Sequence, residues 1–270
     1  MNFTDFIAQR VASGHKLLAP YLCAGYPTPD HTVALLHALA EGGADFIELG
    51  IPFSDPLADG PVLQAASLKA LKAGATPDKA LEAAATFRAQ RAAAGGPEVP
   101  VALMGYTNPF LSMGAETLAR KAQNAGIAAL LVPDLLPELW DHLSAPGMPP
   151  MIPFAAPNTP VERLEELGRL GGPFLYAVAV LGVTGTRENL DDAVPTFLAR
   201  ARAKTGLPVM AGFGISRPEQ VQDLAPSCDG LIIGSALAKA LEAATDPIQA
   251  ATDFLKPFRV ALDALVEKTD

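Results

Sequence analysis

Short apolar runs alternate with longer amphipathic segments along the whole chain. The apolar runs have the length of buried strands, and the segments between them carry apolar residues at helical spacing. We therefore predict eight strands, at residues 17–23, 45–49, 99–104, 128–132, 151–154, 174–180, 208–211 and 230–233. Helices are predicted between them at residues 32–40, 77–94, 117–124, 161–170, 194–203 and 218–224.

This alternation indicates an α/β protein with parallel strands joined by crossover helices. Eight such units favour a closed (β/α)8 TIM barrel, which leaves no edge strand; an open doubly wound sheet is the alternative. We expect an extra N-terminal helix over residues 1–13, with Phe3, Phe6 and Ile7 on one stripe that caps the bottom of the barrel. A last long helix is expected at 248–266, and residues 1–270 are expected to form one domain.

Composition and charge narrow the possible surroundings and partners of the chain. Half of the 270 residues are hydrophobic, yet no apolar run approaches the ~20 residues of a membrane span. The first residues lack the pattern of a secretion signal, so we expect a cytoplasmic protein. The net charge of −9 disfavours nucleic acid and anionic membranes as partners. Cys23 and Cys228 show neither a metal-type spacing nor a disulfide framework.

The densest chemistry follows the second predicted strand, in the sequence ELGIPFSDPLADGP at residues 48–61. Glu48 ends an apolar run, and Asp55 and Asp59 lie on a Pro- and Gly-rich loop that can close over it. Active sites of (β/α)8 barrels lie at such strand ends, and paired carboxyl groups suit proton transfer. The alternative roles are a salt-bridged acid for Glu48 and a turn former for Asp59.

Glycine-rich sequences follow the last three predicted strands. These are Gly182-Val183-Thr184-Gly185, then Gly212-Phe213-Gly214, and finally Gly234-Ser235 at the start of a short helix. Glycines allow backbone N–H groups to approach an anion closely, and a helix N-terminus favours negative charge. Together they predict a phosphate site, although each motif alone could simply make a tight turn. No His, Cys and carboxylate cluster indicates a metal site, and no Ser, His and acid set indicates a nucleophilic triad.

These motifs, in this order, resemble the α subunit of tryptophan synthase. The residues that carry the resemblance are the 48–61 loop, Pro133-Asp134-Leu135, Gly182-Val183-Thr184-Gly185, Gly212-Phe213-Gly214-Ile215-Ser216 and Gly234-Ser235-Ala236. The first motif is long and specific, whereas other phosphate-binding barrels share the glycine motifs.

The resemblance implies cleavage of indole-3-glycerol phosphate to indole and glyceraldehyde 3-phosphate, a retro-aldol reaction without a cofactor. It implies that Glu48 protonates carbon 3 of the indole and that ionised Glu48, or its conjugate partner, takes the proton of the glycerol hydroxyl. It also implies that Asp59 stabilises the positive charge on the ring nitrogen. By the same resemblance, the remaining site residues are Tyr21, Leu63 and Met104 in the indole pocket, Tyr176 beside Glu48, Thr184 and Gly185 on a loop that orders Asp59, and Gly212, Phe213, Gly214, Gly234 and Ser235 around the phosphate.

The resemblance also implies a partner, the tryptophan synthase β subunit, in an α2β2 heterotetramer through which indole is passed. Pyridoxal phosphate would belong to that partner. The docking surface would include residues 52–56 and 106–110, with Pro109 and Phe110 as an exposed apolar pair.

Cys23, Ala179 and Leu181 depart from residues that are common in the family. The open alternatives are a stand-alone lyase that releases indole, another phosphosugar barrel, and a catalytically silent partner of the β subunit.

Overall fold

The computed structural model describes residues 2–178, 193–212 and 214–266. Its strands are β1 (Leu17–Cys23), β2 (Ile47–Gly50), β3 (Val101–Met104), β4 (Ile127–Leu131), β5 (Phe154–Ala155), β6 (Leu175–Val178), β7 (Val209–Gly212) and β8 (Gly230–Ile233). The α-helices are α1 (Phe3–Ala12), α2 (Thr32–Glu41), α3 (Pro61–Lys72), α4 (Pro77–Ala93), α5 (Thr107–Met113), α6 (Ala115–Ala125), α7 (Val161–Leu170), α8 (Ala193–Thr205), α9 (Val221–Leu224), α10 (Ser235–Ala243) and α11 (Pro247–Val266). Short 3-10 helices are η1 (Pro29–His31), η2 (Pro137–Leu143), η3 (Pro218–Gln220) and η4 (Ala225–Ser227).

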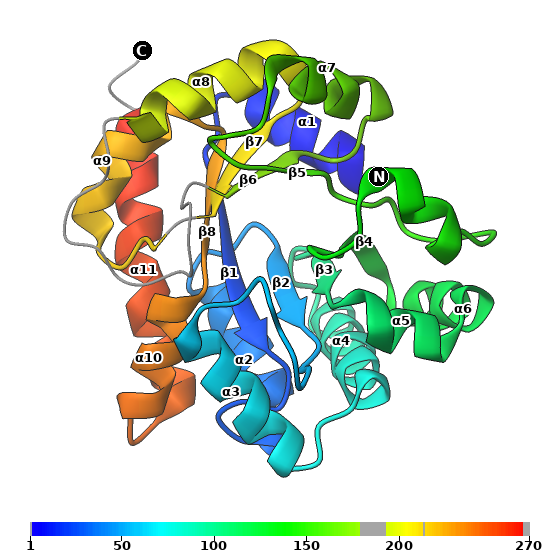
Figure 1. Ribbon diagram of the computed structural model, residues 1–270. Helices are drawn as coiled ribbons and strands as arrows, with labels where there is room; N and C mark the ends of the chain where they lie inside the picture. Colours follow the sequence, from blue (N-terminus) through cyan, green and yellow to red (C-terminus); the bar gives the residue numbers. More distant parts are fainter. Residues whose placement is uncertain (1, 179–192, 213, 267–270) are drawn as a thin grey trace.

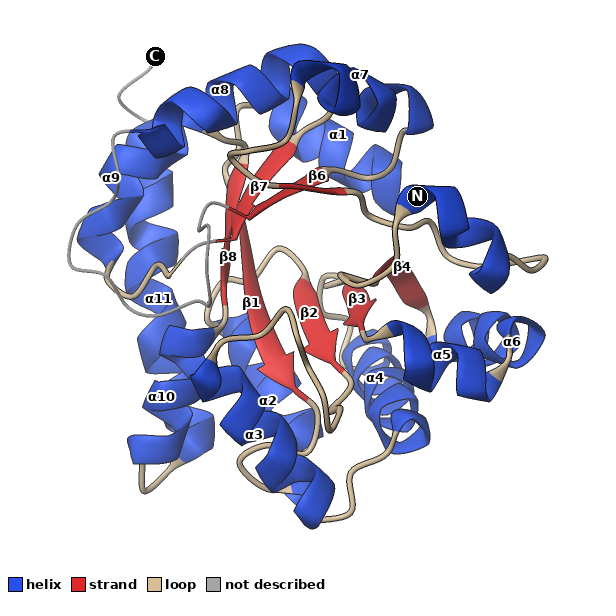
Figure 2. Cartoon of the chain, in the orientation of Figure 1, coloured by secondary structure: helices blue, strands red, loops and turns tan. Residues whose placement is uncertain are grey.

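The eight strands form one parallel sheet in the order β4-β3-β2-β1-β8-β7-β6-β5. A parallel bridge between Leu130 and Met151 joins the two ends of this order, so the sheet curls into a barrel. Helices surround the strands, with α4–α6 on one side and α8–α11 on the other (Figures 1 and 2). The predicted TIM barrel is therefore confirmed, and the open sheet is excluded.

The strands are apolar because both of their faces are covered. All seven residues of β1 are buried, as are all four of β2, β3 and β8. An apolar run without alternation is typical of a parallel strand that lies between a filled barrel interior and an outer layer of helices. This explains why the pattern of the sequence located these strands to within a few residues.

The N-terminal helix α1 closes the bottom of the barrel, as predicted. The Phe3 ring packs edge-on against Phe46, at 5.3 Å between ring centroids, and against Phe174 at 6.5 Å. Phe46 directly precedes β2, and Phe174 directly precedes β6, so both mark the amino ends of strands. Asn2 caps the helix by accepting a hydrogen bond from the N–H of Asp5 at 2.8 Å.

A buried carboxylate at the same end of the barrel fixes the two strands that carry much of the site. Asp45 accepts a hydrogen bond from the N–H of Leu18 at 2.8 Å, and Arg259 of α11 lies 3.0 Å from the same oxygen. This contact ties the start of β1 to the start of β2. In the resulting register Tyr21 lies beside Glu48, and Cys23 lies beside Gly50.

Two helices that the sequence analysis did not assign lie next to the site. Helix α3 begins at Pro61 directly after the acidic loop, and α5 begins at Thr107 directly after β3. Proline at the first helical position is a start signal, but α3 has only a weakly amphipathic pattern over the next residues. The expected exposure of Phe110 is wrong, because Tyr106 and Phe110 are buried in the core.

Candidate active site

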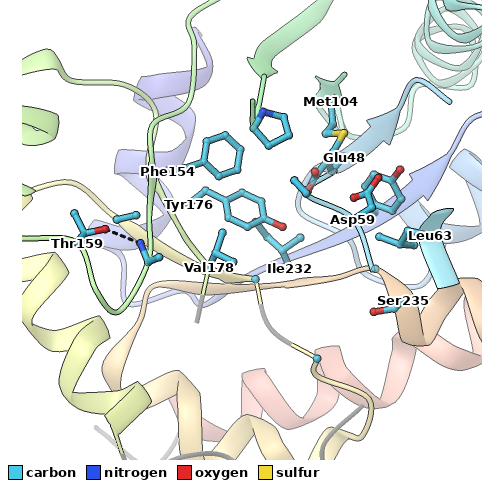
Figure 3. Close-up of a pocket in the computed structure, with 18 residues that line it drawn as sticks. Glu48, Asp59, Leu63, Met104, Phe154, Thr159, Tyr176, Val178, Ile232 and Ser235 are labelled. Atoms are coloured by element: carbon cyan, nitrogen blue, oxygen red, sulfur yellow. Dashed lines mark hydrogen bonds between the residues drawn. The ribbon is translucent and has the colours of Figure 1, made fainter. Parts of the chain in front are cut away.

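A cavity of about 400 Å³ opens at the carboxyl ends of the strands (Figure 3). Of the predicted site residues, Tyr21, Glu48, Asp59, Leu63, Met104, Tyr176, Gly212, Gly214, Gly234 and Ser235 line it. Thr184, Gly185 and Phe213 lie outside the described residues, as do Ala179 and Leu181. The structure thus brings every described member of the predicted set to one pocket.

Glu48 projects from β2 into the barrel and is 3% exposed. It lies two residues before the end of the strand, slightly deeper than the sequence analysis placed it. Among the residues that the structure describes, none donates a hydrogen bond to its buried Oε2 atom. Burial, followed by the negative charge of Asp59, raises the pKa of Glu48 from 4.5 to about 8. The side chain is therefore a protonated acid at neutral pH.

Asp59 lies on the loop between β2 and α3 and faces the same cavity. The Asp59 N–H donates to the Pro56 carbonyl at 3.0 Å, and the Gln64 side chain donates to the Asp59 carbonyl at 2.9 Å. These bonds hold the loop against the first turn of α3. Burial raises the pKa of Asp59 from 3.8 to about 6, while a hydrogen bond from Tyr106 lowers it. Asp59 is thus the more acidic of the two carboxyl groups and is ionised at neutral pH.

Tyr106 anchors this loop, a role that the sequence analysis did not assign to it. Its hydroxyl accepts a hydrogen bond from the N–H of Ala58 at 3.2 Å and donates one to Asp59. Its ring stacks on Phe53, with the centroids 5.4 Å apart. Asp134, which follows β4, accepts hydrogen bonds from both the N–H and the hydroxyl of Thr107, each at 2.9 Å. The end of β3 therefore supports Asp59 from outside the pocket.

The opposite end of the pocket offers backbone N–H groups. Helix α10 begins at Ser235, and Ser235 lines the cavity together with Gly212, Gly214 and Gly234. A Cβ atom at Gly234 would lie 3.4 Å from Tyr21 Cβ and 3.6 Å from Leu63 Cδ1, which are ordinary contacts. Packing against the described residues therefore does not require glycine there. The bare backbone leaves room for close approach of a ligand, and an anion is the ligand that a helix N-terminus favours.

Tyr176 crosses the middle of the cavity and is held in one position. A Cβ atom on Gly212 would lie 2.3 Å from its ring, so the ring occupies the space that this glycine leaves free. Burial and the negative charges of Glu48 and Asp59 raise the pKa of Tyr176 well above its ordinary value. The hydroxyl is thus a neutral donor next to both acids, in agreement with the predicted position beside Glu48.

Several lining residues were not predicted: Ala58, Pro133, Phe154, Ala155, Ala156, Thr159, Val178 and Ile232. Two of them follow from strand periodicity. Val178 is two residues after Tyr176 on β6, and Ile232 is two residues before Gly234, so each points to the same face as a predicted residue. Phe154 and its neighbours lie on and after β5, which is too short to show such a period.

The pKa of Glu48 predicts how stability depends on pH. Between about pH 4.5 and 8 the folded protein retains a proton that the unfolded chain releases, so stability falls as pH rises through this window. Glu48→Gln removes this dependence. We expect the melting temperature of the variant to exceed that of the wild type by roughly 5–10 °C at pH 8, and by far less at pH 4. Scanning calorimetry at both pH values tests this; a difference independent of pH would contradict the assignment.

Comparisons with known proteins agree with this geometry. A family-wide sequence profile described as "Tryptophan synthase alpha chain" matches residues 7–265. The tryptophan synthase alpha chain of Halorhodospira halophila is 42% identical over 259 residues, covering 93% of each chain. That of Laribacter hongkongensis is 43% identical over 267 residues, covering 96% of this chain and 97% of the relative.

Solved structures give the same result. The crystal structure of tryptophan synthase subunit alpha from Legionella pneumophila superposes with a TM-score of 0.87 at 36% identity, covering 98% of this chain and 99% of that one. A chain of Mycobacterium tuberculosis tryptophan synthase superposes with a TM-score of 0.84 at 32% identity, covering 96% and 97%. The chain is therefore a member of the tryptophan synthase alpha chain family.

Proposed function

We propose that this chain cleaves indole-3-glycerol phosphate to indole and glyceraldehyde 3-phosphate, with Glu48 and Asp59 as its catalytic residues. One observation carries the proposal. Two buried carboxyl groups of different acidity face one cavity, which has an aromatic wall on one side and a helix N-terminus on the other. This pocket matches a substrate with an indole ring, a short polar chain and a phosphate.

The first step is protonation of carbon 3 of the indole. The carbon–carbon bond to the glycerol chain cannot break while the ring is aromatic, so the ring must first accept a proton. Glu48 is protonated at neutral pH, and no residue in the described ranges binds its Oε2 atom, so it can deliver this proton. The proton adds to carbon 3, and a positive charge develops on the ring nitrogen.

Asp59 stabilises that positive charge. It is ionised at the pH at which Glu48 is still protonated, and it accepts a hydrogen bond from the ring N–H. Buried in the pocket, its charge acts more strongly than it would in water.

Cleavage of the carbon–carbon bond then restores the proton of Glu48, while Asp59 stays ionised. The ionised Glu48 takes the proton of the adjacent glycerol hydroxyl, and the oxygen forms the carbonyl of glyceraldehyde 3-phosphate. The electrons of the broken bond return to the ring, which becomes neutral, aromatic indole. Glu48 ends the cycle protonated, as it began it.

The phosphate holds the substrate tail at the other end of the pocket. Backbone N–H groups at the start of α10 and at the glycines beside it are the donors that we assign to this task. Fixing both ends of the substrate places carbon 3 near Glu48, which converts binding energy into orientation. The predicted contributions of Thr184, Gly185 and Phe213 belong to the same part of the proposal.

The proposal includes a β subunit as partner, in an α2β2 assembly. Four exposed leucines follow the carboxyl ends of β2, β3 and β4: Leu57 (79% exposed), Leu111 (46%), Leu136 (63%) and Leu139 (44%). Large apolar side chains gathered at one end of a barrel indicate a protein interface. They replace Phe110, which is buried, in the apolar part of the docking surface. The reaction as written needs no cofactor from this chain, and pyridoxal phosphate belongs to the partner.

Two further observations concern membranes and metal ions. None of the helices in the described ranges is long and apolar enough to span a membrane. Within the same ranges, His, Cys, Asp and Glu side chains form no group of three that could hold a metal ion.

Indole release from indole-3-glycerol phosphate tests the function directly. We expect the purified chain to cleave the substrate slowly when alone and much faster when a tryptophan synthase β subunit is added. Fast cleavage by the chain alone would indicate a stand-alone lyase. Acceleration of the β reaction without any cleavage by the chain would indicate a silent partner and would contradict the roles of Glu48 and Asp59.

A further inference from the structure

We propose that Phe154 determines which substituents on the six-membered ring of the indole the pocket accepts. The proposal deepens the function given above and rests on it. It is carried by the position of one aromatic side chain that lines the cavity without being required by the acid–base chemistry.

Phe154 forms the wall of the pocket opposite the anion-binding end. Figure 3 shows its ring on the far side of the pocket from Ser235, with Tyr176 between them. A substrate whose phosphate lies at the start of α10 therefore extends its ring toward Phe154. Met104 and Pro133 also line the pocket, and an apolar wall of this kind suits a planar aromatic ring.

The Phe154 ring cannot easily move away from the pocket. Phe154 and Tyr176 are neighbours in the register of β5 and β6, and their rings stack with centroids 4.9 Å apart and planes inclined by 29°. Tyr176 is in turn fitted against Gly212, where a Cβ atom would lie 2.3 Å from its ring. A ring held against Tyr176 in this way limits the room for a bulky substrate.

The side chains next to Phe154 are small, so Phe154 determines how much room the pocket has at this end. Ala155 and Ala156 follow it along the wall, and each has only a methyl side chain. The Ala156 N–H donates to Thr159 Oγ1 at 2.9 Å, which fixes the turn behind them. Shortening Phe154 therefore enlarges the pocket on the ring side without altering Glu48, Asp59 or the start of α10.

The test uses the reverse reaction, in which indole condenses with glyceraldehyde 3-phosphate. We would compare indole with its four monobromo derivatives at ring positions 4 to 7, in the wild type and in Phe154→Leu. The expected result is that kcat/KM for at least one bromoindole, relative to indole, rises by ~10-fold or more, because small changes in an apolar pocket give differences of this size. The ring position that gains identifies the edge of the indole that faces Phe154.

Phe254→Leu is the matched control. Phe254 is also partly buried and packs against another aromatic ring, Phe258, at 5.3 Å, but it lies on α11 and does not line the cavity. Its relative rates should equal those of the wild type. If Phe154→Leu lowers all five rates equally and leaves their ratios unchanged, Phe154 is only structural and the proposal is wrong.

A binding measurement and a second variant distinguish failure of this proposal from failure of the proposed function and from misfolding of the variant. Calorimetric titration with indole and the bromoindoles measures binding without catalysis, so the wall can be tested even if the chain shows no lyase activity. Tighter relative binding of a bromoindole by Phe154→Leu would support the proposal, and unchanged ratios would overturn it. If Phe154→Leu does not fold, Phe154→Met offers a flexible side chain of similar volume for the same measurements.

Discussion

Glu48→Gln is expected to lower kcat for cleavage of indole-3-glycerol phosphate by at least ~10³-fold, with little change in KM. Glutamine has nearly the same shape as glutamic acid but cannot deliver a proton to carbon 3 of the ring. The backbone groups around Gly234 and Ser235 that we propose as the phosphate contacts should be unaffected, because the Glu48 side chain is not one of them. Steady-state release of indole by the variant, with a β subunit present, measures the effect.

The control for this variant is Glu116→Gln, which changes the same atoms on an exposed residue of α6. It should retain wild-type activity. The higher melting temperature expected for Glu48→Gln at pH 8 excludes unfolding as the cause of a lost rate, because the inactive protein should be the more stable one. Activity within tenfold of the wild type would show that another group supplies the proton.

The barrel could be predicted from the sequence because its strands and helices have different periods. Buried strands such as 17–23 and 230–233 are continuous apolar runs, and the structure places both at the predicted bounds. The shortest strand was also the least accurately predicted. β5 consists of Phe154 and Ala155 alone, so its apolar run carried little information.

Part of the candidate site could also be predicted from the sequence, but from residue type and position rather than from periodicity. Glu48, Asp59 and the glycines could be predicted because several acidic and glycine-rich motifs follow apolar runs that end at the same edge of the barrel. Phe154 and Tyr106 were not, since an aromatic residue beside a strand usually belongs to the core. What distinguishes them is tertiary: Phe154 stacks on Tyr176, and Tyr106 reaches across to Asp59 and Ala58. No local pattern encodes such contacts.

Asp59→Asn is expected to lower kcat/KM by ~10²–10³-fold and to change the shape of its pH profile. In the wild type the rate requires an ionised Asp59 and a protonated Glu48. The profile should therefore rise through about pH 6 and fall through about pH 8. Asparagine can still accept a hydrogen bond from the ring N–H, but it carries no charge to stabilise the cationic ring.

Both limbs of that profile respond to the substitution, and in different ways. The acid limb should disappear, because asparagine does not titrate. The basic limb should move to lower pH, because the negative charge of Asp59 raises the pKa of Glu48 and the variant lacks that charge. Asp223→Asn, the same chemical change on an exposed residue of α9, is the matched control and should keep both limbs. If Asp59→Asn lost activity but kept both limbs, Asp59 would only shape the loop. The loss of one limb together with the movement of the other would therefore show that the two buried carboxyl groups act as a coupled pair.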